Sequence, residues 1–208
     1  MESHDVMRLP RARAKEAVEV LTRAFAEDPM YVHMFPVRAA RTRPMRGMMR
    51  MIVAYTLVYG ELYTTRDVSG VACWLPPGET EVRPLRSAAA GWHSLRSFLL
   101  LRPSSMLRAL SLFGYMEATH RQLITEPHWY LWDIAVEPAF QGQGVGRALV
   151  LPVLKRADRD MLACYLETSN EKNLGVYGKW GFGVAAEGRP PGAFGPKVFS
   201  LVRPPKQG

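Results

Sequence analysis

The chain has few cysteines and no long hydrophobic run. Only Cys73 and Cys164 are present among 208 residues, and each lies in an alternating apolar segment where a buried free thiol is expected. No apolar run is long enough to cross a bilayer, and the N-terminal segment mixes acidic residues with arginines instead of carrying the apolar core of a signal peptide. We therefore expect a cytoplasmic chain without disulfides and without a membrane partner.

Metal-binding patterns are also missing from the sequence. The five histidines are scattered at positions 4, 33, 93, 120 and 128, and neither they nor the cysteines have the spacing of a metal site. We predict that the chain uses no metal.

Acidic residues are the minority charge. Lys and Arg together number 27 against 19 Asp and Glu, which gives a formal net charge of +8. This balance suits a nucleic acid, an acidic membrane surface or an anionic cofactor. Arginines gather only at positions 38, 41, 43, 46 and 50, where they would form a solvated helix face or touch a cofactor phosphate. With 48% hydrophobic residues and no repeats, we expect a single domain over 1–208.

Hydrophobic periodicity predicts a mixture of helices and strands. Helices are expected at 12–27, at 40–60 and at 145–159, the last with a kink at Pro152. Two further helices should form an insertion over 84–122, before the central strand. Strands are expected at 61–65, 71–75, 128–136 and 161–167, followed by two more between 183 and 203.

The segment 128–136 alternates as a central strand should. A regular pleat would place its side chains on two faces of the sheet. One face would carry His128, Tyr130, Trp132, Ile134 and Val136, and the other Trp129, Leu131, Asp133 and Ala135.

A glycine-rich loop follows this strand and precedes a predicted helix. Gly142, Gly144 and Gly146 alternate in it, which removes side chains that would keep a ligand from the backbone N–H groups. Arg147 stands where a dinucleotide-binding fingerprint needs a small residue, and the Gly-Lys-Ser/Thr ending of a P-loop is absent. The loop therefore indicates an anion site of another kind.

A second block over 166–182 indicates a strand followed by a short, well-delimited helix. Thr168 and Glu171 have the spacing of a capping box, and Gly181 lies where a left-handed residue would end the helix. Asn173 and Tyr177 are four residues apart, so both should project from one face toward the neighbouring sheet.

These two blocks together resemble the GCN5-related N-acetyltransferase (GNAT) family. Its Gln/Arg-x-x-Gly-x-Gly/Ala signature is matched by Gln141, Gly144 and Gly146, and its closing pattern by Asn170, Tyr177, Gly181 and Phe182. The stretch from 120 to 182 is most similar to puromycin N-acetyltransferases, through the segments 126–131, 150–152, 166–169 and 173–174. The first hundred residues depart from those enzymes, so puromycin itself is not assigned as the substrate.

The resemblance implies an α/β (α+β) fold of the GNAT type. Its central sheet is mixed, mostly antiparallel and twisted, is splayed at the acetyl-CoA site and is flanked by helices. In the family, the backbone of the splayed strand and the glycine loop hold the cofactor. The implied cofactor-binding residues here are Ile134, Ala135, Val136, Gln141, Gly142, Gln143, Gly144, Val145, Gly146, Arg147, Asn173 and Tyr177.

The resemblance also implies an acyltransferase that moves acetyl directly from acetyl-CoA to a primary amine of a small molecule. An aminonucleoside or an antibiotic-like amine is among the candidate acceptors. Tyr177 would protonate the leaving thiolate, because a tyrosine stays protonated at neutral pH. The candidate base is Glu167, with Glu117 and His128 as alternatives, and the candidate acceptor-side residues are Asp28 and Tyr31.

Other functions stay open at this point. A non-catalytic acyl-CoA sensor or interaction module would use the same fold, and acyl donors longer than acetyl would suit the same motifs. A nucleic-acid-binding protein would use the positive charge. Because Tyr177 is retained, we expect an enzyme without a nucleic-acid partner, acting as a monomer or homodimer.

Overall fold

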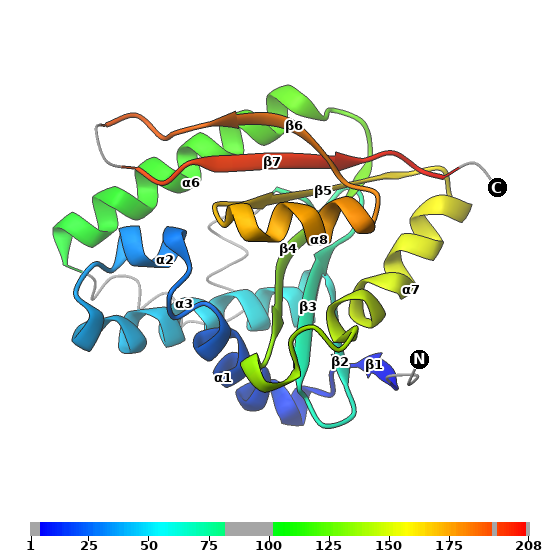
Figure 1. Cartoon of the computed structure of the whole chain (residues 1–208), viewed down its shortest axis with the longest axis horizontal. Helices are drawn as coiled ribbons and strands as arrows, with labels where there is room; N and C mark the ends of the chain where they lie inside the picture. Colours follow the sequence, from blue (N-terminus) through cyan, green and yellow to red (C-terminus); the bar gives the residue numbers. More distant parts are fainter. Residues whose placement is uncertain (1–4, 82–101, 193–194, 207–208) are drawn as a thin grey trace.

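The computed structural model describes residues 5–81, 102–192 and 195–206. A single seven-stranded sheet extends through all three ranges in the order β1-β2-β3-β4-β5-β7-β6 (Figure 1). Neighbouring strands are antiparallel except β4 and β5, which are parallel. The mixed, mostly antiparallel sheet expected from the sequence is confirmed.

The strands are β1 Val6–Arg8, β2 Glu61–Thr65, β3 Gly70–Leu75, β4 His128–Val136, β5 Ala163–Thr168, β6 Gly183–Gly188 and β7 Val198–Arg203. The helices are α1 Ala14–Ala24, α2 Pro29–Met34, α3 Arg38–Tyr59, α6 Pro103–Leu123, α7 Val145–Arg159 and α8 Leu174–Lys179. Short 3₁₀ helices are η1 Arg11–Arg13, η2 Pro138–Phe140 and η3 Glu171–Asn173.

Most of these elements agree with the predicted ranges. The helix α7 runs unbroken across Pro152, and the kink expected there stays a prediction. Both cysteines are buried free thiols, as predicted. Strand β1 was not predicted, because three residues are too few to show an alternation. Of the predicted helical insertion over 84–122, only α6 and the residues around it are described, and 82–101 lie outside the described residues.

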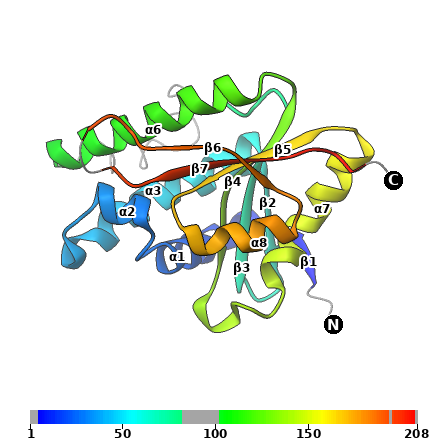
Figure 2. The same ribbon diagram turned by 45° about the horizontal axis from the view of Figure 1, so that its top comes forward.

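Helices cover both faces of the sheet (Figure 2). On one face, α1 and α3 bury apolar side chains such as Leu21 and Met49 in a core shared with β3. On the other face, α7 and α8 bury Leu149 and Tyr177 against β4 and β5. Helix α6 crosses beside β6 and β7. No helix within the described ranges is long and apolar enough to span a membrane.

The central strand β4 departs from the regular pleat. Asp133 pairs with Cys73 of β3, whereas the next residue, Trp74, pairs with Leu131, so Trp132 is an extra residue in the ladder. Such a bulge reverses the facing of every residue beyond it.

The predicted assignment of faces in β4 is therefore wrong after Trp132. Ile134 and Val136 join Trp129 in the core under α7, and Ala135 packs in the core under α1 and α3. A single inserted residue does not interrupt the run of mostly apolar residues, so the alternation does not reveal the bulge.

Candidate active site

Strands β4 and β5 separate after the first third of β4. They pair only over the three positions from His128 to Tyr130, whereas β4 stays paired to β3 as far as Val136. The backbone edge of Ile134, Ala135 and Val136 that faces β5 therefore has no strand partner in the described chain (Figure 1). This is the splay expected from the family resemblance.

The glycine loop joins β4 to α7. Gly142 and Gly144 have φ angles of 80° and 86°, left-handed values that glycine adopts without strain. The side-chain amides of Gln141 and Gln143 donate hydrogen bonds to the carbonyl oxygens of Val136 and Ala139, at 3.1 Å and 2.9 Å, which braces the loop.

The start of α7 is open to an anion. Gly144 is its N-cap residue, and no side chain in the described chain caps the helix, so the N–H groups of the first turn are left for an external acceptor. Val145 is buried and anchors the turn, whereas Arg147 is exposed within it. A Cβ atom on Gly146 would lie 3.4 Å from the Trp180 ring, so a larger residue would crowd this turn.

The helix α8 begins differently from the prediction. The side chain of Asn170 caps the turn η3 before it by accepting a hydrogen bond from a backbone N–H at 3.2 Å. Thr168 Oγ1 instead accepts from the Asn170 N–H at 3.1 Å. The predicted capping box at Thr168 is therefore wrong, because this residue still belongs to β5. Gly181 ends the helix with a φ of 95°, as predicted.

Asn173 and Tyr177 face the same cavity from this helical segment. The Tyr177 side chain is buried, and burial raises its pKa, so the hydroxyl keeps its proton. A hydrogen bond with the Asn173 side chain lowers the pKa of Tyr177, against the larger effect of burial. A buried, protonated tyrosine of this kind can act as a proton donor.

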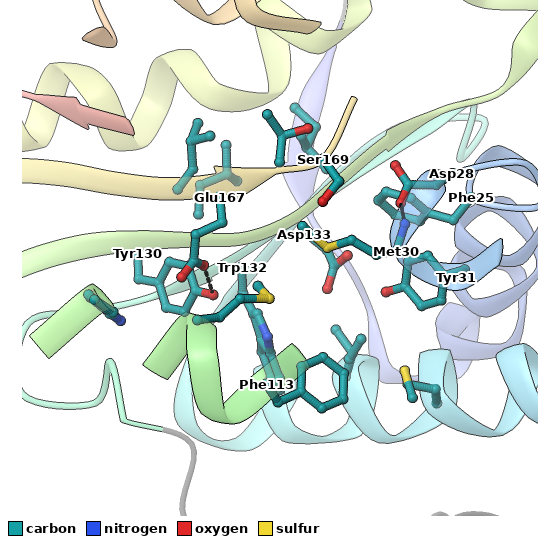
Figure 3. Close-up of a pocket in the computed structure, with 18 of the residues that line it drawn as sticks. Phe25, Asp28, Met30, Tyr31, Phe113, Tyr130, Trp132, Asp133, Glu167 and Ser169 are labelled. Atoms are coloured by element: carbon teal, nitrogen blue, oxygen red, sulfur yellow. Dashed lines mark hydrogen bonds between the residues drawn. The ribbon is translucent and has the colours of Figure 1, made fainter. Parts of the chain in front are cut away.

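The cavity measures about 550 Å³ and lies between β4, the end of β5 and helices α2, α3, α6 and α8. Its walls are mostly aromatic, methionine and aliphatic side chains, including Phe113 and Trp132 (Figure 3). Four carboxyl groups also line it, from Asp28, Glu117, Asp133 and Glu167. Acidic side chains thus gather in this cavity although the whole chain has a net positive charge.

Glu167 points from β5 into this cavity. Tyr130 donates a hydrogen bond to its Oε2 at 2.6 Å (Figure 3). Tyr165 donates one to its Oε1 at 2.9 Å. Burial raises the pKa of Glu167 to about 7, and the two tyrosine hydroxyls oppose that rise. The carboxyl is therefore able to gain or lose a proton near neutral pH.

The residues before and within α2 form another wall. Asp28 caps α2 by accepting a hydrogen bond from the Met30 N–H at 2.9 Å, and burial raises its pKa to about 6. Tyr31 is buried beside Asp133, and the two side chains interact. Both residues predicted for the acceptor side thus line the cavity.

Asp133 is a site residue that the sequence reasoning missed. Burial, followed by the charge of Asp28, raises the pKa of its carboxyl well above the ordinary range. The regular pleat assigned Asp133 to the face of Trp129, and the bulge at Trp132 turns it to the cavity instead. A lone acidic residue in an otherwise apolar strand was the available signal.

Comparisons with known proteins agree with this geometry. The model of the acetyltransferase (GNAT) family matches residues 72–182, which is more than half of the chain. The chain belongs to the GNAT acetyltransferase family. It is therefore an acyltransferase of the N-acetyltransferase type, and enzymes of this family generally use acetyl-CoA as the donor.

Individual relatives of this GNAT chain are distant in sequence. It is 25% identical over 180 residues to an uncharacterized N-acetyltransferase of Schizosaccharomyces pombe, covering 81% of this chain and 70% of that protein. A crystal structure of histone acetyltransferase HPA2 and related acetyltransferase from Corynebacterium glutamicum is 25% identical, with a TM-score of 0.69 and coverage of 100% and 99% of the two chains. An arylalkylamine N-acetyltransferase 2 structure from Aedes aegypti, 14% identical, shares the fold with a TM-score of 0.63 over 98% and 99%.

The predicted site residues of this GNAT protein lie in three places. Those that line the cavity are Asp28, Tyr31, Ile134, Glu167, Asn173 and Tyr177. Ala135 and Val136 pack in the cores on the two faces of the sheet. The glycine loop lies outside the cavity lining, at the N-terminus of α7. Such a division suits a long cofactor whose reactive end enters the cavity while its phosphates stay at the surface.

The two alternatives to Glu167 as base are otherwise engaged. Glu117 lines the cavity but forms an ion pair with Arg121 at 2.8 Å. His128 Nδ1 lies 2.7 Å from the Glu126 carbonyl oxygen, so Nδ1 carries the proton, and its Nε2 lies 2.7 Å from Nε2 of His120. Burial lowers the pKa of both histidines, that of His120 to about 4.

Proposed function

We propose that this chain is an acetyl-CoA-dependent N-acetyltransferase that moves acetyl directly to a primary amine of a small molecule. The observation that carries the proposal is one cavity at the splay of β4 and β5 that is lined by both Glu167 and Tyr177. The first is a carboxyl with a pKa of about 7, and the second is a buried tyrosine whose raised pKa keeps it protonated. A base for the amine and an acid for the leaving thiolate are thereby supplied in one space.

The chain has the groups that acetyl-CoA requires. The open N-terminus of α7 and the left-handed Gly144 suit its pyrophosphate, with Arg147 exposed on the same turn. The unpartnered backbone edge over 134–136 suits the amide groups of its pantetheine arm. Bound acetyl-CoA would supply the acetyl group as an activated thioester.

The protein's own groups then divide the work of the transfer. Glu167 accepts the proton that the ammonium group of the acceptor must lose before nitrogen can attack. Backbone N–H groups of the edge over 134–136 stabilise the negative charge that develops on the carbonyl oxygen. As the C–S bond breaks, Tyr177 gives its proton to the departing sulfur, and the second proton that the acylated nitrogen sheds restores the tyrosine hydroxyl.

The cavity walls favour an acceptor with an apolar body. Phe25, Phe113 and Trp132 provide aromatic surface, and the carboxyl groups provide the polar end that an amine needs (Figure 3). An aminonucleoside or antibiotic-like amine has this combination. An arylalkylamine has it too, and the Aedes aegypti structure with the same fold carries that name.

The test is amine-dependent release of coenzyme A from acetyl-CoA by the purified chain, with the acetylated amine identified by mass spectrometry. Glu167→Gln should lower turnover by roughly a hundredfold to ten-thousandfold, as for the loss of a general base. Glu117→Gln is the matched control, because this second glutamate of the cavity is already paired with Arg121. A folded protein that binds acetyl-CoA but acetylates none of a broad amine panel would favour the sensor interpretation.

A further inference from the structure

Asp28 and Asp133 have no cationic partner in the described part of the chain. This is unusual in a protein with 27 Lys and Arg residues, in which acidic groups such as Glu19 and Asp158 are paired with arginines. Asp133 is only 9% exposed, so solvent gives its charge little stabilisation.

The two aspartates line the same cavity, and Figure 3 shows both on the same side of it. The charge of Asp28 adds to the raised pKa of Asp133, after the larger effect of burial. Tyr31 opposes this effect through a hydrogen bond, but a hydroxyl brings no positive charge. A cation between the two carboxylates would relieve both the repulsion and the cost of burial.

Ser169 supplies an independent indication of a ligand. The residue is 7% exposed and lines the cavity, and its Oγ has no hydrogen-bond partner among the described residues. Figure 3 shows Ser169 on the same side of the cavity as Asp133 and Asp28. A buried hydroxyl without a partner is rare in a folded protein, and a bound ammonium or guanidinium group would supply the missing donor.

Glu167 forms a separate acidic centre. Its two oxygens accept hydrogen bonds from Tyr130 and Tyr165, whereas no aspartate is among the causes of its pKa shift. Figure 3 shows Glu167 beside Tyr130 and away from Asp28. Apolar side chains of the cavity wall, including Trp132, lie between these two carboxyl groups. The cavity thus has two acidic ends and an apolar middle.

We propose that Asp28, Asp133 and Ser169 form a subsite for a second positive charge on the acceptor. The substrate class is then a dibasic amine, either a diamine or an amine that carries a guanidinium group, with an apolar chain between its two ends. The inference rests on the proposed function, in which the nitrogen next to Glu167 receives the acetyl group. The other nitrogen stays charged between the two aspartates.

Calorimetric binding to the full chain tests the subsite without requiring turnover. The probes are hexamethylenediamine, hexylamine and aminohexanol, which share one chain length and differ only at the far end. The wild type should bind the diamine roughly tenfold or more tightly than the other two, in line with one desolvated charge pair. Equal affinities for the three compounds would overturn the proposal.

Asp28→Asn and Asp133→Asn should each remove most of that preference. Asparagine also caps helices well, so Asp28→Asn keeps the start of α2, and a thermal melt verifies that each variant is folded. Asp160→Asn, which removes an exposed carboxyl paired with Arg159, is the control that should keep the preference. If both aspartate variants weaken hexylamine and the diamine by the same factor, the aspartates do not recognise the second charge.

Parallel turnover measurements separate this inference from the proposed function. A protein that prefers the diamine in binding but releases no coenzyme A from acetyl-CoA retains the subsite and contradicts the function. A protein that acetylates hexylamine and the diamine with equal kcat/KM retains the function and contradicts the subsite.

Discussion

The hydroxyl of Tyr130 donates a hydrogen bond of 2.6 Å to Oε2 of Glu167, and Tyr165 donates one of 2.9 Å to Oε1. Both bonds stabilise the ionised carboxylate and so lower the pKa of Glu167, against the larger upward effect of burial. The balance leaves the pKa at about 7. The two tyrosines therefore adjust the pH range in which Glu167 can serve as a base.

Tyr130→Phe should shift the pH dependence of acetylation. A base must be deprotonated, so wild-type kcat/KM should rise with pH and level off above about 7, the pKa of Glu167. Removing the Tyr130 hydroxyl takes away a group that lowers this pKa, so the acidic limb should move to higher pH. Tyr63→Phe is the matched control, since Tyr63 bonds a glutamate outside the cavity. An unmoved limb in Tyr130→Phe would separate Glu167 from the base role.

Tyr177→Phe should lower kcat while acetyl-CoA affinity changes little. The ring contact with Trp180, at 5.4 Å between centroids, does not need the hydroxyl, so the fold should be kept. Loss of a general acid lowers turnover by roughly ten- to a thousandfold, and the effect should appear in kcat and kcat/KM together. Steady-state kinetics and calorimetry with acetyl-CoA measure the two quantities. Wild-type turnover in this variant would remove Tyr177 from the acid role.

Much of the site was predictable from two local motifs. The glycine loop and the Asn170–Phe182 block are each formed by residues that are close together in the sequence. Their residue types and spacing, such as alternating glycines and a tyrosine one helical turn beyond an asparagine, therefore indicate the local structure. Tyr177 was predicted on that basis, whereas Glu167 was one of three candidate bases, and both residues line the cavity. Their roles in catalysis stay predictions.

The rest of the site depends on register and on contacts between distant segments. The bulge at Trp132 turns Asp133 toward the cavity, and no residue in the strand marks it. The short distance between His120 and His128 requires α6 to end beside β4. The repulsion between Asp28 and Asp133 joins positions far apart in the chain, so only the folded structure shows it.

Gly144→Trp should abolish acetyl-CoA binding. Gly144 has a φ of 86° at the N-cap of α7, so a tryptophan there would both strain the backbone and fill the space next to the open N–H groups. Gly78→Trp is the control. Gly78 has a similar φ of 85°, has open space around it, and follows the C-terminal end of β3, outside the glycine loop. Calorimetry should show wild-type affinity in Gly78→Trp only. Equal affinity in both variants would place the pyrophosphate elsewhere.

Asp158→Ala should destabilise the fold by about 3 kcal/mol, as expected when one partner of a buried ion pair is removed. Arg203 donates two hydrogen bonds of 2.7 Å to Asp158 and one of 3.0 Å to the Trp180 carbonyl. Its side chain is only 3% exposed, so the change leaves a buried charge unpaired.

The effect of Asp158→Ala should also depend on pH, because Arg203 lowers the pKa of Asp158. The pair therefore stabilises the fold above the unfolded pKa of about 3.9, and this contribution is lost as pH falls through the lower folded value. Urea unfolding should show a gap from wild type that narrows in acid, with a far smaller effect in Asp160→Ala, whose partner Arg159 is exposed. A gap independent of pH would mean that packing, and not charge, gives Asp158 its effect.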